Sequence, residues 1–272
     1  MKTLIKNGLL IDSANQVQAY LNLILEDGKV VAVTEEEPEA DRVIDATGKV
    51  VAPGFIDIHM HEDPVKDGKI EFCIFDAMLR MGVTTAVGGN CGINVYDPVK
   101  YLDLLERDGA PVNVMMFAGH QYYREAAGAL DKYSPVTEEQ RKMMKKGLEE
   151  ALEAGCVGIS YGLRYVPGTG REEFLDTASC CQKEHRLISA HVRDDEERVF
   201  GAVAEVAEAG KIFDIPVEIS HIGSMAGFGQ MEQLLKQIDG YRMNGMDIAC
   251  DCYPYFAFST RIGATTYDDG WL

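Results

Sequence analysis

The sequence has no long apolar run and no excess of positive charge. None of its hydrophobic stretches reaches the roughly 20 residues that a membrane-spanning helix needs, and the first ten residues lack the apolar core and cleavage site of a secretory signal. The net charge of −18 would be repelled by nucleic acid and by an anionic membrane surface. These absences predict a cytoplasmic protein that binds neither nucleic acid nor a membrane.

Cysteine and phosphate-binding patterns are also sparse. The seven cysteines are an odd number without zinc-ribbon spacing, so they predict no disulfide framework. No GxGxxG follows a predicted strand, and no GxxxxGK[ST] occurs. The sequence therefore contains neither the common dinucleotide-binding pattern nor a P-loop.

Residues 1–52 contain short β-rich runs separated by turn signals. Runs of this kind are Thr3–Ile5, Leu21–Leu25 and Val30–Val33. Asp27-Gly28 stands between two of them, which is a strong hairpin signal. We expect a small β domain here, with no catalytic residue.

From Phe55 the pattern changes to short apolar strands that alternate with helix-length amphipathic segments, which predicts βαβ units and a parallel sheet. Seven strands and six helices are one unit short of a (β/α)8 barrel. The predicted domain is 53–272. The strands are expected near 55–60, 83–88, 112–118, 157–162, 187–192, 215–220 and 246–251, and the helices near 71–81, 97–107, 138–154, 172–185, 196–209 and 228–243.

His59 and His61 end the first predicted strand of this domain. Side chains alternate along a strand, so the two imidazoles point the same way and can reach one metal ion. The pair alone fits equally well with two solvated or hydrogen-bonded polar residues. The other strand ends decide between these interpretations.

Three further strand ends carry imidazole or thiol groups. Cys91 follows the second strand, and His191 and His221 end the fifth and sixth. Barrel enzymes place their chemistry at the carboxyl ends of their strands, so these side chains are expected to converge. Nitrogen and sulfur ligands without a carboxylate cage favour zinc. His120 follows the third strand and could face the same pocket.

The chain resembles the amidohydrolase superfamily and, within it, the D-aminoacylase (N-acyl-D-amino-acid deacylase) group. The small β domain leading into the HxH strand is typical of the superfamily, and the Asn-Cys-Gly element is more specific to the group. The matching motifs are Pro53–His61, Gly89–Gly92, Gly158–Tyr165 followed by Pro167-Gly168, Ala190–Asp194, Ser220-His221 and Tyr253–Tyr255.

The resemblance implies a TIM-like (β/α)8 amidohydrolase barrel lacking its last unit, preceded by part of a β-sandwich. Cys91, His191 and His221 would bind zinc tightly. His59 and His61 would form a second, weaker site, which Cys91 could bridge. The implied reaction is hydrolysis of a linear amide, an N-acyl-D-amino acid, to a carboxylate and a D-amino acid.

The general base of the group is an aspartate at the eighth strand, which we expect beyond Leu272. Asp251, at the end of the seventh strand, does not match that position. The chain therefore resembles a fragment or a truncated gene product, with little activity expected of it alone.

The substrate of this group carries a carboxylate, and the lysine that usually binds it would stand at Gly223. Arg164 and Arg193 are candidate replacements, because a guanidinium binds both carboxylate oxygens. Tyr165, Tyr253 and Ser259 match other substrate contacts. Packing is the alternative role for all three, and for Ser259 it fits equally well.

Three other interpretations stay open at this point. The chain could act on a cyclic amide, as dihydroorotases and hydantoinases do, or it could be a deaminase. It could also be an inactive remnant that only binds metal. The cyclic amidases bridge their metals with a carbamylated lysine on the fourth strand, and the predicted fourth strand, Val157–Gly162, has no lysine.

Overall fold

The computed structural model describes residues 1–260, which fall into two compact units. The first unit is Met1–Phe55, and the second begins at Ile56. The Gly-, Thr- and Asp-rich stretch before Trp271-Leu272, and any general base after it, lie outside the described residues.

The first unit is a β-sandwich portion made of two small sheets. One sheet has the strand order β5-β4-β1-β6 and the other β3-β2-β7. Asp27 and Gly28 join β4 to β5 with positive φ angles of 49° and 78°, so the predicted hairpin is confirmed. The strands are β1 Lys2–Lys6, β2 Leu9–Asp12, β3 Val17–Tyr20, β4 Asn22–Glu26, β5 Lys29–Thr34, β6 Arg42–Asp45 and β7 Val50–Val51.

The second unit is built on a curled seven-stranded sheet with the order β16-β15-β14-β13-β12-β11-β8. Neighbouring strands from β11 to β16 pair in parallel. Consecutive strands lie side by side, so their carboxyl ends gather at one edge. The strands are β8 Phe55–Asp57, β11 Val83–Gly88, β12 Asn113–Gly119, β13 Gly158–Gly162, β14 Leu187–His191, β15 Val217–Ile219 and β16 Ile248–Cys250.

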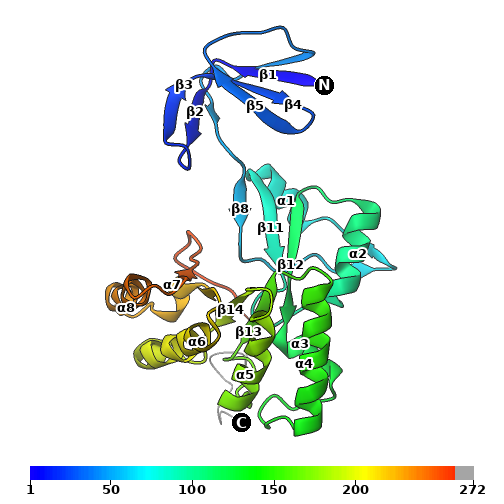
Figure 1. Ribbon diagram of the computed structural model, residues 1–272, viewed down its shortest axis with the longest axis vertical. Coiled ribbons are helices and arrows are strands. Elements are labelled where there is room, and N and C mark those ends of the chain that lie inside the picture. Colours follow the sequence, from blue (N-terminus) through cyan, green and yellow to red (C-terminus); the bar gives the residue numbers. More distant parts are fainter. Residues whose placement is uncertain (261–272) are drawn as a thin grey trace. The chain divides into compact units, whose positions relative to one another are not determined.

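Helices connect these strands and lie around the sheet (Figure 1). Helix α4 shows how the sequence specifies them: Thr137 and Gln140 form a capping box, and Met144 and Leu148 are fully buried on one face. The helices are α1 Ile74–Arg80, α2 Pro98–Asp108, α3 His120–Ala126, α4 Glu138–Glu153, α5 Arg171–Ala178, α6 Val199–Phe213, α7 Ile222–Met225 and α8 Met231–Met243.

All seven predicted strands of this unit are present, but the helices differ in places. The helix expected over 172–185 ends at Ala178, and one 3-10 turn, Ser179–Cys181, follows it. Helices α3 and α7 and the small hairpin of β9 (Val65–Lys66) and β10 (Lys69–Ile70) were not expected. They are short inserts between longer elements, and periodicity needs a longer window than these segments offer.

The core of the second unit lies between the sheet and its helices. Met116, Ile159 and Ile188 from three neighbouring strands are fully buried, together with Leu148 and Phe174 from the covering helices. Within residues 1–260, no helix combines the length and the apolar character that crossing a bilayer would require. The core therefore fixes the sheet edge at which the candidate ligands stand.

Candidate metal centre

Five candidate ligands follow the carboxyl ends of four strands. They form two sets that share Cys91, and within each set the ligand atoms lie within 4.8 Å of one another. One set is Cys91, His191 and His221, and the other is His59, His61 and Cys91. The structure thus brings together all five residues that the sequence indicated as metal ligands.

A tight turn after β11 presents the Cys91 thiol. Gly89, Cys91 and Gly92 all have positive φ angles, of 76°, 56° and 77°. This conformation costs little for glycine but is unfavourable for cysteine. A Cβ atom at Gly92 would lie 2.7 Å from the backbone nitrogen of Gly162. Glycine is therefore required where the turn packs against β13.

Two polar side chains hold this turn in place. The amide of Asn90 donates to the carbonyl oxygens of Ile58 and Val87 at 3.2 and 2.8 Å. The Ser160 hydroxyl accepts a hydrogen bond from the Gly92 N–H at 3.0 Å and donates to the Gly89 carbonyl. Asn90 thereby ties the strand end that carries His59 to the turn that carries Cys91.

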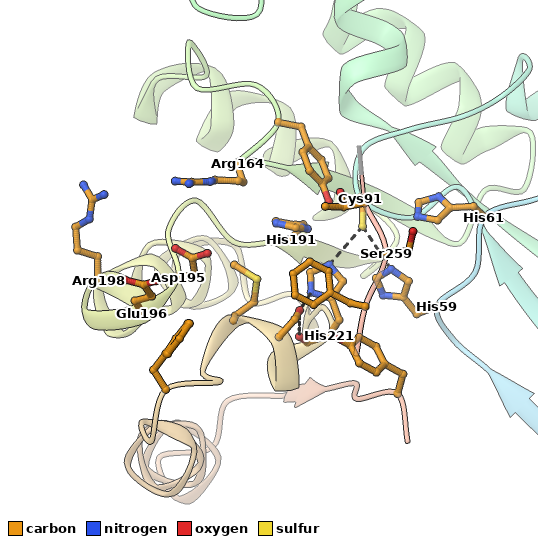
Figure 2. A pocket seen from close by; sticks show the side chains of 17 residues that line it. His59, His61, Cys91, Arg164, His191, Asp195, Glu196, Arg198, His221 and Ser259 are labelled. Atoms are coloured by element: carbon orange, nitrogen blue, oxygen red, sulfur yellow. Dashed lines mark hydrogen bonds between the residues drawn. The ribbon is translucent and has the colours of Figure 1, made fainter. Parts of the chain in front are cut away.

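The sulfur of Cys91 lies between two imidazoles. Its distances to His59 Nε2 and His221 Nε2 are 3.4 and 3.6 Å. Figure 2 shows this arrangement, with His191 beside it and His61 at the side of His59. A sulfur and several ring nitrogens facing one point are the donor set that zinc prefers.

His191 provides the observation that tests the fit to a metal. Its side chain is 5% exposed, and within the described part of the chain neither of its ring nitrogens has a hydrogen-bond partner. The rings of Tyr165 and His221 pack against it at centroid distances of 4.4 and 4.3 Å. A buried nitrogen without a partner is costly, and a metal ion bound there would satisfy it.

The electrostatics favour uncharged imidazoles in this pocket. Burial lowers the pKa of His191 well below its usual value and that of His221 to about 4, and neighbouring histidines add to both shifts. Burial also raises the pKa of the Cys91 thiol. The rings of His191 and His221 are therefore in their metal-binding form at neutral pH, whereas the Cys91 thiol must lose a proton to bind a metal.

Two carboxylates beside the ligands, the buried Glu218 and the partly buried Asp251, make contacts that the sequence did not predict. Asp251 Oδ2 lies 2.7 Å from His59 Nδ1, and Glu218 accepts hydrogen bonds from the hydroxyls of Ser189 and Ser220. The available signals were an acidic residue inside the apolar run of β15 and an aspartate directly after β16. Their contacts join residues far apart in the chain, so neither signal specified a partner.

A cavity of about 560 Å³ opens beside the ligands. Four of the five predicted substrate residues line it: Arg164, Tyr165, Tyr253 and Ser259. Figure 2 shows Arg164 with Asp195, Glu196 and Arg198 at the side of the cavity away from His59 and His61. The cavity thus has a group of possible metal ligands on one side and two guanidinium groups on the other.

Arg193, the fifth predicted substrate residue, is not among the cavity-lining residues. Its guanidinium forms an ion pair with Glu205, with Nη2 to Oε1 at 2.8 Å, and also donates to the Thr169 carbonyl. The structure therefore favours Arg164 of the two candidate cations.

Gly223 and His120 have structural explanations. A Cβ atom at Gly223 would lie 2.8 Å from the Cys252 sulfur, so the thiol occupies space that a larger side chain would need. His120, which could have faced the pocket, is 1% exposed at the start of α3. Its Nε2 lies 2.9 Å from Glu173 Oε1, and it is not among the residues that line the cavity.

The comparison with protein-family models agrees with the interpretation of the motifs. Residues 42–161 match the model described as the amidohydrolase family. This segment includes the HxH strand and the Cys91 turn. This part of the chain is therefore similar to the amidohydrolase family.

Curated relatives and a solved structure narrow the similarity within the amidohydrolases. The chain is 31% identical to D-aminoacylase and 32% identical to N-acyl-D-glutamate deacylase, both from Alcaligenes xylosoxydans xylosoxydans, over 95% and 94% of its own length. The crystal structure of N-acyl-D-glutamate deacylase from Bordetella bronchiseptica, complexed with zinc and a phosphonate inhibitor, has a TM-score of 0.82 and 30% identity, and the match covers 93% of this chain. The chain spans 57 to 58% of the length of these proteins.

Proposed function

We propose that the protein hydrolyses a linear amide with the help of zinc, and that the substrate is an N-acyl-D-amino acid. The observation that carries the proposal is the convergence of Cys91, His191 and His221 on one point of a cavity that Arg164 also lines. The similarity to D-aminoacylase and to N-acyl-D-glutamate deacylase supports the class of substrate.

Each group would have a separate task in this reaction. Cys91, His191 and His221 would hold a tightly bound zinc, and His59 and His61 would complete a weaker site beside it. Zinc bound there would supply a Lewis acid and lower the pKa of a water molecule. The general base that the resemblance implies, an aspartate after Leu272, lies outside the described residues.

Arg164 would bind the substrate carboxylate. Its Nη1 lies 3.7 Å from Asp194 Oδ1, a long ion pair compared with the 2.8 Å contact of Arg193 with Glu205. Arg164 lines the cavity and Arg193 does not, so a carboxylate in the cavity is better placed to reach Arg164. Tyr165, Tyr253 and Ser259 would contact the rest of the substrate from the cavity wall.

The cyclic-amidase alternative is not favoured. Strand β13 has the sequence Gly-Ile-Ser-Tyr-Gly and contains no lysine that could be carbamylated to bridge two metals. Tyr161 of this strand is fully buried and packs edge-to-face on Phe174, while Ser160 holds the Cys91 turn. The residues of this strand are thus committed to packing and to positioning the thiol.

Equilibrium binding tests the substrate class without depending on turnover. We expect the zinc-loaded protein to bind N-acetyl-D-amino acids more tightly than their L enantiomers and more tightly than dihydropyrimidines, as measured by titration calorimetry. Any release of free amine from the D substrates should require zinc. Tighter binding of a dihydropyrimidine, or equal binding of the two enantiomers, would contradict the proposal.

Arg164→Met, with Arg193→Met as its matched control, tests the carboxylate site. A hydrogen bond to a charged group contributes about 1.5–3 kcal/mol, so Arg164→Met should weaken substrate binding about ten- to a hundredfold and leave zinc content unchanged. Arg193→Met should lower stability, because Glu205 loses its partner, but it should leave substrate affinity intact. Loss of affinity in the Arg193 variant alone would assign the carboxylate site to Arg193.

A further inference from the structure

We propose that Asp251 is a positioning residue that couples the two ligand sets, holding His59 of one set and His221 of the other with a single carboxylate. The proposal rests on the zinc centre proposed above. It assigns Asp251 a role distinct from that of the general base, which the resemblance implies elsewhere.

The first contact of Asp251 fixes the tautomer of His59. Asp251 Oδ2 lies 2.7 Å from His59 Nδ1, and a carboxylate can only accept, so the proton of the neutral ring stands on Nδ1. The lone pair on Nε2 then faces the Cys91 sulfur at 3.4 Å. A carboxylate in this position is the usual means of orienting a histidine that binds a metal.

The second contact holds the backbone of His221. This residue has φ 35° and ψ 52°, a left-handed conformation that is unfavourable for a side chain with a Cβ atom. Asp251 Oδ1 accepts its N–H at 2.6 Å, and the Ile222 N–H donates to the Asp251 carbonyl at 3.0 Å. These bonds offset the unfavourable backbone conformation and leave the His221 Nε2 3.6 Å from the sulfur.

Glu218 holds the backbone of Asp251 through a hydrogen bond. The Asp251 N–H donates to Glu218 Oε1 at 3.1 Å. Glu218 in turn accepts hydrogen bonds from the hydroxyls of Ser189 and Ser220. The backbone of Asp251 is therefore anchored to a buried carboxyl group that is itself held in place.

Two substitutions separate the two contacts. In Asp251→Asn, one oxygen can still accept the His221 N–H, but the new amide group offers only N–H donors to His59. His59 would then adopt the other tautomer, with the proton on Nε2, where it can no longer bind metal. In Asp251→Ala both contacts disappear.

The tautomer is measured directly by nitrogen-15 NMR of the histidine rings in metal-free protein. We expect the Nδ1–H form of His59 in the wild type and the Nε2–H form in Asp251→Asn. Finding the Nε2–H form in the wild type, or no change in the variant, would overturn the proposal. This readout needs neither zinc nor turnover, so it is independent of the proposed function.

Zinc titration followed by elemental analysis gives the second readout. Asp251→Asn should keep the tight zinc and bind the second about 10–100-fold more weakly, the range typical of outer partners of metal ligands, whereas Asp251→Ala should weaken both. Unchanged binding in both variants would overturn the coupling. A wild type that binds no zinc would instead overturn the proposed metal centre.

Asp63→Asn is the matched control for folding. Asp63 is 1% exposed and accepts backbone N–H groups of Cys73, Ile74 and Phe75 at the start of α1. It is absent from the cavity lining. This variant should lower the melting temperature and leave zinc binding and the His59 tautomer unchanged. If it lost as much zinc as Asp251→Asn does, the effect of Asp251→Asn would be explained by general destabilisation of the fold, and the proposal would fail.

Discussion

The two ligand sets share the Cys91 sulfur but differ in the solvent exposure and the hydrogen bonding of their histidines. His191 is 5% exposed and has two ring nitrogens without hydrogen-bond partners among the described residues. His61, in the other set, is exposed, and the ring of His59 is hydrogen-bonded to Asp251. The buried set thus carries a cost in the metal-free protein that the exposed set does not.

This difference indicates which set should bind metal more tightly. A buried nitrogen without a partner gains the full interaction with an ion, whereas an exposed nitrogen must first give up water. The left-handed conformations of Cys91 and His221 further show that the fold holds the buried set in one geometry. We therefore expect a tight site at Cys91, His191 and His221 and a weaker one at His59 and His61.

Cys91→Ala should have the largest effect, because it removes the atom that both sets share. Zinc affinity should fall by more than the roughly hundredfold loss that follows removal of an outer partner. Elemental analysis after dialysis measures the effect, and Cys181→Ala, which alters a fully buried cysteine away from the cavity, is the control. Equal zinc content in the two variants would exclude Cys91 from the centre.

His191→Ala and His61→Ala compare the sets directly, and their effects should be smaller. The first should lose the tight zinc, since it removes one of the three ligands of that set. The second should lose only the weaker zinc, because His61 belongs only to the exposed set. Zinc titrations against a competing chelator distinguish the two variants. Loss of the tight zinc in His61→Ala, with the tight zinc retained in His191→Ala, would contradict the assignment of the two sites.

Proton release on zinc binding is a smaller effect, and it reports the protonation states of the ligands at the tight site. At pH 7 the raised pKa of Cys91 keeps the thiol protonated, whereas the lowered pKa values of His191 and His221 keep both rings neutral. Binding of the first zinc should therefore release about one proton and strengthen about tenfold per pH unit as pH rises toward neutrality. Competition by protonation of His221 should begin only near its pKa of about 4. Calorimetry in buffers of different ionisation enthalpy counts the protons, and a count of two or more would mean that the imidazoles are charged.

The strands and the ligand types could be predicted from the sequence because both depend on local patterns. Alternation of apolar strands and amphipathic helices located β11 and β13 to within one residue of their ends, and strand-end positions indicated His191 and His221. The glycines on either side of Asn90-Cys91 also have a local explanation, because both adopt the positive φ angles that glycine tolerates best.

Contacts between distant segments could not be predicted in this way. The bond between His59 and Asp251 joins residues 192 positions apart, and its partner could not be chosen from the many acidic residues in the sequence. The ion pair of Arg193 with Glu205 depends on how α6 packs beyond β14. In the sequence, Gly223 was only a departure from the lysine of the D-aminoacylase group. The structure explains it, because the Cys252 sulfur lies beside this position.

X-ray absorption at the zinc edge, on protein loaded with one equivalent, tests the central claim most directly. If the buried set binds first, the spectrum should show one sulfur at about 2.3 Å and two imidazole nitrogens at about 2.0–2.1 Å from the metal. Cys91→Ala should abolish the sulfur signal, and His61→Ala should leave the spectrum unchanged. A first zinc surrounded only by nitrogen and oxygen, or a spectrum altered by His61→Ala, would contradict the account.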